Sequence, residues 1–271
     1  MQHNTDDLDW LGLKTSSEGL QAALTVHPTQ TNPTGRLYGG VAVAASIAVM
    51  EQVTSRSITW TTVQFSSSCG AGETIDLAAT ISASGRRTSQ VRVTAAVDGR
   101  ELFTALGATV DPPRAGATGL NGQWEAMPSV DMPDACPPLE LRQPEAEACA
   151  ESHILLSDMR TAIGFEDQPP AQVALWCRPH GVARLSAAVL GWQADMLGIA
   201  LAKASGGSGG TSLDNTVRFG PPAPRGAEWV LLDMRGQAIV DGYGHGTTHL
   251  WAPDATLLAT ASQTCIMRRA G

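Results

Sequence analysis

A proline-rich stretch in the middle of the sequence constrains the fold most, because it interrupts regular structure between two halves of similar length. Seven of the sixteen prolines lie within residues 111–150, at positions 112, 113, 128, 133, 137, 138 and 144. Proline cannot donate a hydrogen bond to a helix or to a sheet ladder. The pattern predicts an irregular linker over residues 112–151, between an N-terminal unit (residues 1–111) and a C-terminal unit (residues 152–271).

Each half shows the same succession of secondary-structure patterns. In the first half, a strand-like run over residues 20–26 precedes a small, apolar, uncharged run that predicts a buried helix beginning at Gly39–Gly40 and extending to residue 53. Extended runs separated by glycine-containing turns follow, over residues 57–68, 74–84, 88–97 and 101–110. The second half repeats the scheme, with strand-like runs over 151–164 and 171–179, a helical run over 183–204 and extended runs that end at Met267.

The last extended run of each half gives the clearest internal repeat. Residues 98–109 match residues 254–264 after a one-residue gap. This register aligns Ala108 with Gln263, so the first half has a small apolar residue where the second half has an amide. A duplicated fold in which one copy has become specialised would show this pattern.

The helical run over residues 183–204 contains a single acid, Asp195. Ala188, Trp192, Asp195 and Ile199 follow one another at helical spacing, so they are predicted to share one stripe of a continuous helix. That stripe faces the core, where a carboxylate costs on the order of several kcal/mol unless partners compensate it. Asp195 is therefore either a structurally paired acid or a functional one.

Composition and charge exclude several classes of protein. Hydrophobic residues make up 43% of the chain and charged residues 16%, which allows a large core and argues against global disorder. The formal net charge is −8 and no basic cluster occurs, so we do not expect nucleic-acid binding. The longest uncharged apolar run, Val41–Met50, is too short to span a bilayer. The first ten residues are acidic and polar, unlike a secretory signal, which predicts a cytoplasmic protein.

The cysteines and histidines do not form a recognisable metal-binding pattern. The five cysteines are odd in number, widely spaced and without a Cys-x-x-Cys pair, which favours reduced thiols over a disulfide or zinc framework. His245 and His249 could share a strand face, but no third ligand has suitable spacing. We therefore expect no metal and no cofactor.

Four segments carry a resemblance to a known family. LYGGVAVAAS (37–46) is similar to the Phe-Gly-Gly opening of that family's central helix. WQADMLG, TSLDNTVRF and ATASQTCIMRR follow in the second half, similar to Y-x-S-D, [ST]-L-D-H-x-x-W-F and A-x-x-x-Q-E-x-x-x-R. In these segments, which span most of both halves, the sequence resembles the acyl-CoA thioesterase II (TesB-like) family. The resemblance implies an α+β fold, a tandem (double) hotdog in which a long antiparallel sheet wraps around two central helices.

The resemblance also implies three catalytic residues, Asp195, Ser212 and Gln263. Thioester hydrolysis needs an activated water, and a desolvated carboxylate can take a proton from it. A hydroxyl and an amide can orient that water, or the thioester oxygen, without adding charge. Strand alternation does not distinguish Ser212 from its neighbour Thr211, but the family register favours Ser212. Asn215 stands where the family usually carries histidine, and the adjacent Asp214 is expected to be structural.

Strand alternation also predicts which way Gln263 points. It shares one face of its strand with Leu257, Ala259, Ala261 and Cys265, so its amide is predicted to face the apolar side, toward Asp195. A surface amide facing water is the structural alternative.

Two glycine motifs require separate interpretations. Gly39 and Gly40 open the first predicted helix, whose unpaired N–H groups suit an oxyanion or a substrate. Close packing of the helix against the sheet explains the same two glycines equally well. The GGSGG run over residues 206–210 matches G-x-S-x-G, but it lies between a helix and a strand in the wrong order for a nucleophile elbow. Ser208 is therefore predicted to lie in a flexible connector.

These observations lead to two main functional hypotheses. The first is an enzyme of fatty acid metabolism that hydrolyses fatty acyl-CoA to free fatty acid and CoA. The alternative is a double hotdog that binds acyl-CoA or another lipid thioester without cleaving it. A hotdog dehydratase ranks last, because no Asp–His helix motif of that type occurs. The partner implied is acyl-CoA, with no nucleic acid and no membrane span, and a homo-oligomer of double hotdogs is left open.

Overall fold

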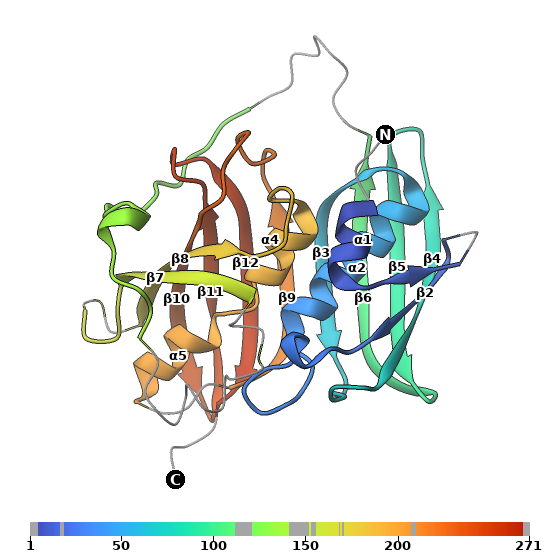
Figure 1. Cartoon of the computed structure of the whole chain (residues 1–271), viewed down its shortest axis with the longest axis horizontal. Coiled ribbons are helices and arrows are strands. Elements are labelled where there is room, and N and C mark those ends of the chain that lie inside the picture. The colour runs from blue at the N-terminus through green and yellow to red at the C-terminus, as the bar shows by residue number, and fades with distance from the viewer. Residues whose placement is uncertain are drawn as a thin grey trace.

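The computed structural model describes residues 5–16, 19–111, 121–140, 152, 156–167, 169, 171–206 and 210–267. Within these residues one sheet of twelve strands runs through the whole molecule, in the order β1-β2-β4-β5-β6-β3-β9-β12-β11-β10-β8-β7. The main helices lie together on one side of this sheet, as Figure 1 shows.

The two halves contain corresponding elements. The first half holds β1 (Lys14–Thr15), β2 (Gln21–Thr25), β3 (Ser57–Phe65), β4 (Thr74–Ser84), β5 (Thr88–Val97) and β6 (Arg100–Val110), with helices α1 (Thr5–Leu11) and α2 (Gly39–Thr54). The second half holds β7 (Ser157–Ile163), β8 (Gln172–Pro179), β9 (Thr211–Phe219), β10 (Val230–Val240), β11 (Tyr243–Trp251) and β12 (Leu257–Ile266), with helices α4 (Ala187–Gln193) and α5 (Gly198–Ser205). Short 3-10 turns, η1 (Pro28–Gln30) and η2 (Pro133–Ala135), lie outside these elements.

The strand order repeats outward from the junction between β3 and β9. In one direction it reads β3-β6-β5-β4-β2-β1, and in the other it reads β9-β12-β11-β10-β8-β7. Each strand of the first half therefore has a counterpart at the same place in the second half, and all the pairings are antiparallel. The predicted double hotdog, with one continuous sheet wrapped around central helices, is confirmed.

Helix α2 is the centre of the first half. Every residue from Gly40 to Met50 is buried, which a run of small apolar side chains permits. Helix α4 crosses α2 at Gly191, where an added Cβ would lie 2.5 Å from Ile47 Cδ1 and 3.0 Å from Val43 Cγ1. The absence of a side chain at Gly191 therefore allows the two central helices to pack closely.

The prediction of one continuous helix over residues 183–204 is wrong. Helix α4 ends at Gln193 and α5 begins at Gly198, so Asp195 lies in a break between two short helices. Asp195 is buried, as predicted, but not because it shares a continuous helical stripe with Trp192 and Ile199.

Side chains from other elements stabilise the break. The Tyr38 hydroxyl donates to the Trp192 carbonyl at 2.9 Å, and the Asn215 amide donates to the Ala194 carbonyl at 3.4 Å. These carbonyls belong to the last turn of α4, which has no further helical N–H groups to bind them. The break is thus held by residues distant in sequence, which a helical periodicity cannot reveal.

Part of the predicted linker covers the outer face of the second half. The Trp176 indole N–H donates to the Asp131 carbonyl at 2.9 Å, and the buried Cys136 joins a cluster with Ala174, Trp176, Leu231 and Trp251. Residues 121–140 are irregular apart from η2 and an antiparallel bridge between Pro138 and Arg160 of β7, in keeping with their prolines. The predicted linker ends at 112 and 151 lie outside the described residues. No helix in the described part of the chain is long and apolar enough to span a membrane.

Candidate active site

The Asp195 carboxylate meets the inner faces of β9 and β12. Its Oδ1 accepts hydrogen bonds from the Ser212 hydroxyl at 3.4 Å, from the Asn215 amide at 3.2 Å and from the Gln263 amide. Gln263 Nε2 also donates to Ser212 Oγ at 2.7 Å. Asp195 is 9% exposed, Gln263 is 3% exposed and Asn215 is fully buried. The carboxylate is therefore held by several donors in a largely desolvated setting.

The structure brings together the three residues that the family resemblance implied. Ser212, Gln263 and Asp195 form one hydrogen-bonded cluster, whereas the Thr211 side chain is exposed. Gln263 faces inward with Ala259, Ala261 and Cys265, as alternation predicted. Leu257 is an exception: a register shift separates it from Ala259, and it packs against the outer cluster that contains Trp176.

A β-bulge in β9 explains how both Ser212 and Asn215 reach Asp195. Ser212 pairs with Cys265 and Asp214 pairs with Thr264, so Leu213 is an extra residue in the strand. In a regular strand, residues three apart face opposite sides of the sheet. The bulge turns Ser212 and Asn215 to the same inner side. The sequence gives no signal for this bulge, and the contact of Asn215 with Asp195 was not predicted for that reason.

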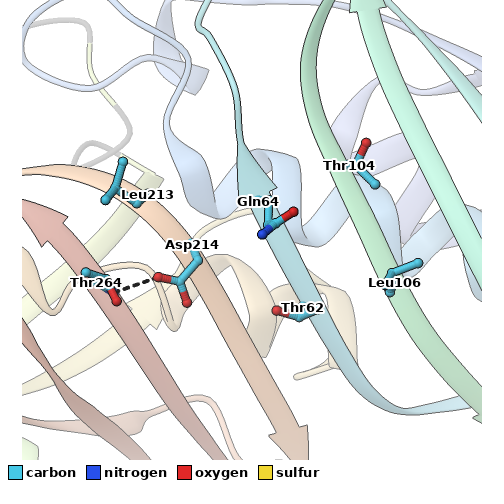
Figure 2. Close-up of a pocket in the computed structure, with 7 residues that line it drawn as sticks. All are labelled: Thr62, Gln64, Thr104, Leu106, Leu213, Asp214 and Thr264. Atoms are coloured by element: carbon cyan, nitrogen blue, oxygen red, sulfur yellow. Dashed lines mark hydrogen bonds between the residues drawn. The ribbon is translucent and has the colours of Figure 1, made fainter.

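The outer side of the same bulge carries Asp214. Its Oδ1 accepts a hydrogen bond from the Thr264 backbone N–H at 3.0 Å, drawn as a dashed line in Figure 2. The pocket around it is lined by Thr62, Gln64, Thr104, Leu106, Leu213, Asp214 and Thr264. The helices lie behind the sheet in this view, so the pocket is on the face opposite Asp195 and is separate from the candidate site.

The first two residues of α2 pack directly against the candidate site. A Cβ on Gly39 would collide with Asp195 Oδ2 and lie 3.1 Å from Phe65 Cζ. A Cβ on Gly40 would collide with the Trp192 carbonyl and with the Tyr38 ring. The two glycines therefore allow the start of α2 to approach the break between α4 and α5. Their close packing involves this break as well as the sheet.

Burial determines the protonation behaviour of Asp195. It raises the pKa of the Asp195 carboxyl to about 7, against hydrogen bonds from Asn215, Ser212, Gln263 and the Gly40 backbone that lower it. Near neutral pH this carboxyl is therefore both ionised and protonated in comparable amounts, which suits a group that accepts and returns a proton. Burial, with the nearby Asp195 second, also raises the pKa of Tyr38 well above its usual value.

The first half has a corresponding bulge, where the Ile58 backbone N–H donates to the half-buried Glu51 carboxylate at 2.8 Å. Ile58 pairs with Thr109 and Trp60 with Ala108, so Thr59 is the extra residue in β3. Matching the two bulges aligns Ile58 with Ser212, and it aligns Gly107 with Gln263. The predicted alignment of Ala108 with Gln263 is wrong by one position, because a comparison of the last strands alone does not contain the bulge that fixes the register.

The other motifs lie elsewhere. His245 is exposed and His249 is half-buried, on the outer side of β11. In the described residues, no group of three or more His, Cys, Asp or Glu side chains could hold a metal ion. Ser208 lies outside the described residues.

The fold and the site define the chain as a double-hotdog protein with an acid, a hydroxyl and amides at a helix N-terminus. Comparison with family models identifies the family. A model of the acyl-CoA thioesterase N-terminal domain matches residues 27–111, and a model of the acyl-CoA thioesterase C-terminal domain matches residues 133–267. The chain belongs to the acyl-CoA thioesterase family, and its fold is a double hotdog.

Solved structures agree with this assignment. A protein from Novosphingobium aromaticivorans, provisionally described as a thioesterase, is 31% identical with a TM-score of 0.82, over 94% of this chain and 98% of its own. The tesB protein of Mycobacterium avium subsp. paratuberculosis is 19% identical with a TM-score of 0.78, over 98% and 99% of the two chains. A hot dog fold protein from Alicyclobacillus acidocaldarius is 19% identical with a TM-score of 0.80, over 98% of both chains. Among curated proteins, none matches the sequence significantly.

Proposed function

We propose that the protein hydrolyses fatty acyl-CoA to a free fatty acid and CoA, with Asp195 as the general base. The observation that carries the proposal is the convergence of Ser212, Asn215 and Gln263 on Asp195 Oδ1 beside the N-terminus of α2. Membership of the acyl-CoA thioesterase family supports a thioester as the substrate. The reaction would be a step of fatty acid metabolism, and the cytoplasm is the location that we propose for it.

The proposed reaction begins with a water molecule next to the Asp195 carboxylate. Asp195 takes one proton while the water oxygen attacks the thioester carbonyl carbon. The tetrahedral intermediate then collapses, the carbon–sulfur bond breaks, and the CoA thiolate receives the proton from Asp195. One water is consumed, and the carboxylate is restored for the next turnover.

Gln263 and Ser212 are proposed to orient the carboxylate and the water. The Gln263 amide nitrogen already donates to both Asp195 and Ser212. Its amide oxygen is buried and has no hydrogen-bond partner among the described residues. A buried acceptor of this kind is costly unless it is used, and the second hydrogen of the attacking water would satisfy it.

The start of α2 is proposed to stabilise the developing oxyanion. A helix N-terminus carries unpaired N–H groups and a partial positive charge. The Gly40 N–H is engaged by Asp195, which leaves the Gly39 N–H as the donor for the thioester oxygen. This role is compatible with the close packing of both glycines, because both uses require the backbone of α2 to lie next to Asp195.

A thiol-release assay across acyl-CoAs of different chain lengths tests the proposal. We expect the protein to release CoA from at least one of these substrates, with release abolished or strongly reduced in Asp195→Asn. Binding of the same acyl-CoAs should be measured in parallel by calorimetry. Tight binding without thiol release by the unmodified protein would reject hydrolysis and favour the binding-protein alternative.

A further inference from the structure

The β9 bulge presents Ser212 and Asn215 on the inner face of the sheet and Asp214 on the outer face. Asp214 lies outside the proposed catalytic cluster. We propose that Asp214 is a positioning residue: its carboxylate holds the bulge on the outer face, and the bulge keeps Ser212 and Asn215 turned toward Asp195 on the inner face. The kinetic consequence rests on the proposed function. The structural consequence does not.

The contact that carries the inference is a hydrogen bond between neighbouring strands. Asp214 Oδ1 accepts the Thr264 backbone N–H at 3.0 Å, one residue from the extra residue Leu213. A bulge disrupts the regular ladder locally, so a side-chain acceptor at this point can fix where the irregularity lies. If the bulge moved along β9, Ser212 would point away from Asp195, because a shift of one residue exchanges the two faces of a strand.

The surroundings of Asp214 favour this use of its charge. The pocket residues Thr62, Gln64, Thr104, Leu106, Leu213 and Thr264 carry no positive side chain that could pair with it. Figure 2 shows the carboxylate directed at the neighbouring strand β12, where Thr264 lies. Asp214 thus acts through the backbone of β12, and the strand β12 also carries Gln263.

The first half provides an internal comparison. Its strand β3 has the same bulge, at Thr59, but the position that corresponds to Asp214 is Trp60. The inner positions of that bulge are Ile58 and Thr61. The Ile58 backbone N–H donates to the half-buried Glu51 carboxylate at 2.8 Å, and the Thr61 hydroxyl donates to the Leu106 carbonyl at 3.2 Å. Neither side chain therefore binds a carboxylate as Ser212 and Asn215 do. The outer carboxylate, Asp214, therefore occurs in the second half, where Ser212 and Asn215 bind Asp195 on the inner side.

The experiment compares Asp214→Ala with a matched control, Asp254→Ala. Asp254 Oδ1 accepts the Thr256 backbone N–H at 3.0 Å, which is the same kind of contact at an exposed turn outside the proposed site. We expect kcat to fall by about 10- to 100-fold in Asp214→Ala with little change in KM, because misplaced catalytic groups lose turnover more than binding. The acidic limb of the pH–rate profile should move to higher pH, since Asp195 loses hydrogen-bond donors. Asp254→Ala should match the unmodified protein in both respects.

The conservative variant Asp214→Asn separates the acceptor from the charge. Asparagine keeps an oxygen that can accept the Thr264 N–H, so we expect most of the turnover and the original pH profile to return. The same variant decides the question if Asp214→Ala is not recovered folded. A folded Asp214→Asn protein that has lost tenfold or more in kcat would overturn the proposal.

Two measurements test the structural part without any turnover. In Asp214→Ala, amide hydrogen exchange at Thr264 should become faster, and the carboxyl carbon of Asp195 should titrate at higher pH by NMR. If the unmodified protein hydrolyses no acyl-CoA, the proposed function fails while these two readouts still decide the role of Asp214. Unchanged Thr264 exchange together with an unchanged Asp195 titration would reject it.

Discussion

Asn215 and Gln263 are direct cross-strand partners on β9 and β12, and both side-chain amides donate to the same oxygen of Asp195. With Ser212 as a further donor, Oδ1 is surrounded by polar groups, while Oδ2 lies against Gly39. One carboxylate oxygen is thus fixed by the sheet and the other faces the start of a helix. Experiments can therefore separate the effect of the Asp195 charge from the effect of its packing against α2.

Asp195→Asn should abolish most turnover without unfolding the protein. Asparagine keeps the size of the side chain and one acceptor but cannot take a proton, so kcat should fall by roughly 10²–10⁴-fold. The melting temperature should hold or rise, because a desolvated charge has been removed. Thiol release and thermal melting check the two parts. A loss of stability with activity retained would instead identify Asp195 as a structural partner.

The pH dependence of activity and that of stability should have opposite signs. The proposed mechanism requires ionised Asp195, so kcat should rise with pH through about 7. The pKa in the folded state is above the ordinary value of 3.8, so the folded chain binds this proton more tightly than the unfolded chain. Its contribution to stability is therefore present at low pH, declines as pH rises from about 4 to about 7, and is then constant.

Denaturant melts of the unmodified protein and Asp195→Asn should isolate this contribution. Burial also raises the pKa of Glu51 to about 7, and Glu51 is present in both proteins. The difference between the two stability curves therefore reports Asp195, with a slope of at most about 1.4 kcal/mol per pH unit. Parallel curves between pH 4 and 7 would show that folding does not raise the pKa of the Asp195 carboxyl.

Gln263→Ala should lower turnover with a small effect on folding. The variant removes a donor to both Asp195 and Ser212, so the proposed base and hydroxyl lose their common anchor. Gln172→Ala is a matched control, because Gln172 donates to the buried carboxylate of Asp233 at 2.6 Å in another part of the sheet. We expect Gln172→Ala to lower the melting temperature and to leave kcat unchanged. Ser208→Ala should change neither.

Gly39→Ala should reduce both activity and stability, whereas Gly198→Ala should be tolerated. Each glycine is the first residue of its helix, but a Cβ at Gly39 would collide with Asp195 and a Cβ at Gly198 has its nearest neighbour at 3.9 Å. Alanine has a higher helix propensity than glycine, so both substitutions would stabilise their helices if no collision occurred. Thermal melting and thiol release of the pair measure the effect of the collision. Equal behaviour of the two variants would remove the packing argument.

Residues 1–111 expressed alone should aggregate or remain unstable. Without the second half, β3 loses its partner β9 and becomes an unpaired edge, and α2 loses its contact with α4. Light scattering and a thermal melt of the fragment, beside the full chain, check this expectation. A monomeric fragment with a sharp melt would show that the predicted division at residues 111 and 152 separates independent folding units.

Local patterns in the sequence predict the strands and α2 well, because alternation and a charge-free apolar run are properties of neighbouring residues. The strands β4 and β5 begin and end where the extended runs do. The break at Asp195 could not be predicted in this way. It depends on Tyr38 and Asn215, which reach α4 from other parts of the chain.

In the candidate site, too, some features could be predicted from the sequence and others depend on distant parts of the chain. Asp195, Ser212 and Gln263 were implied by a family resemblance, and their proximity in the structure does not depend on it. Asn215 was missed because its orientation requires the bulge at Leu213, which strand alternation does not encode. The same omission shifted the alignment of the two halves by one residue, to Ala108 instead of Gly107.

The pairing of β3 with β9 also determines when the sheet can be completed during synthesis. Thr62 and Thr216, whose Oγ1 atoms are 2.6 Å apart at this junction, are separated by 154 residues of chain. At about 5–20 residues per second, a ribosome needs roughly 8–30 seconds to make the second strand after the first. During that interval the nascent first half has an open edge backed by an apolar helix. A neighbouring nascent chain could supply the missing strand, so translation on crowded polysomes is the stage at which strand-exchanged dimers would form.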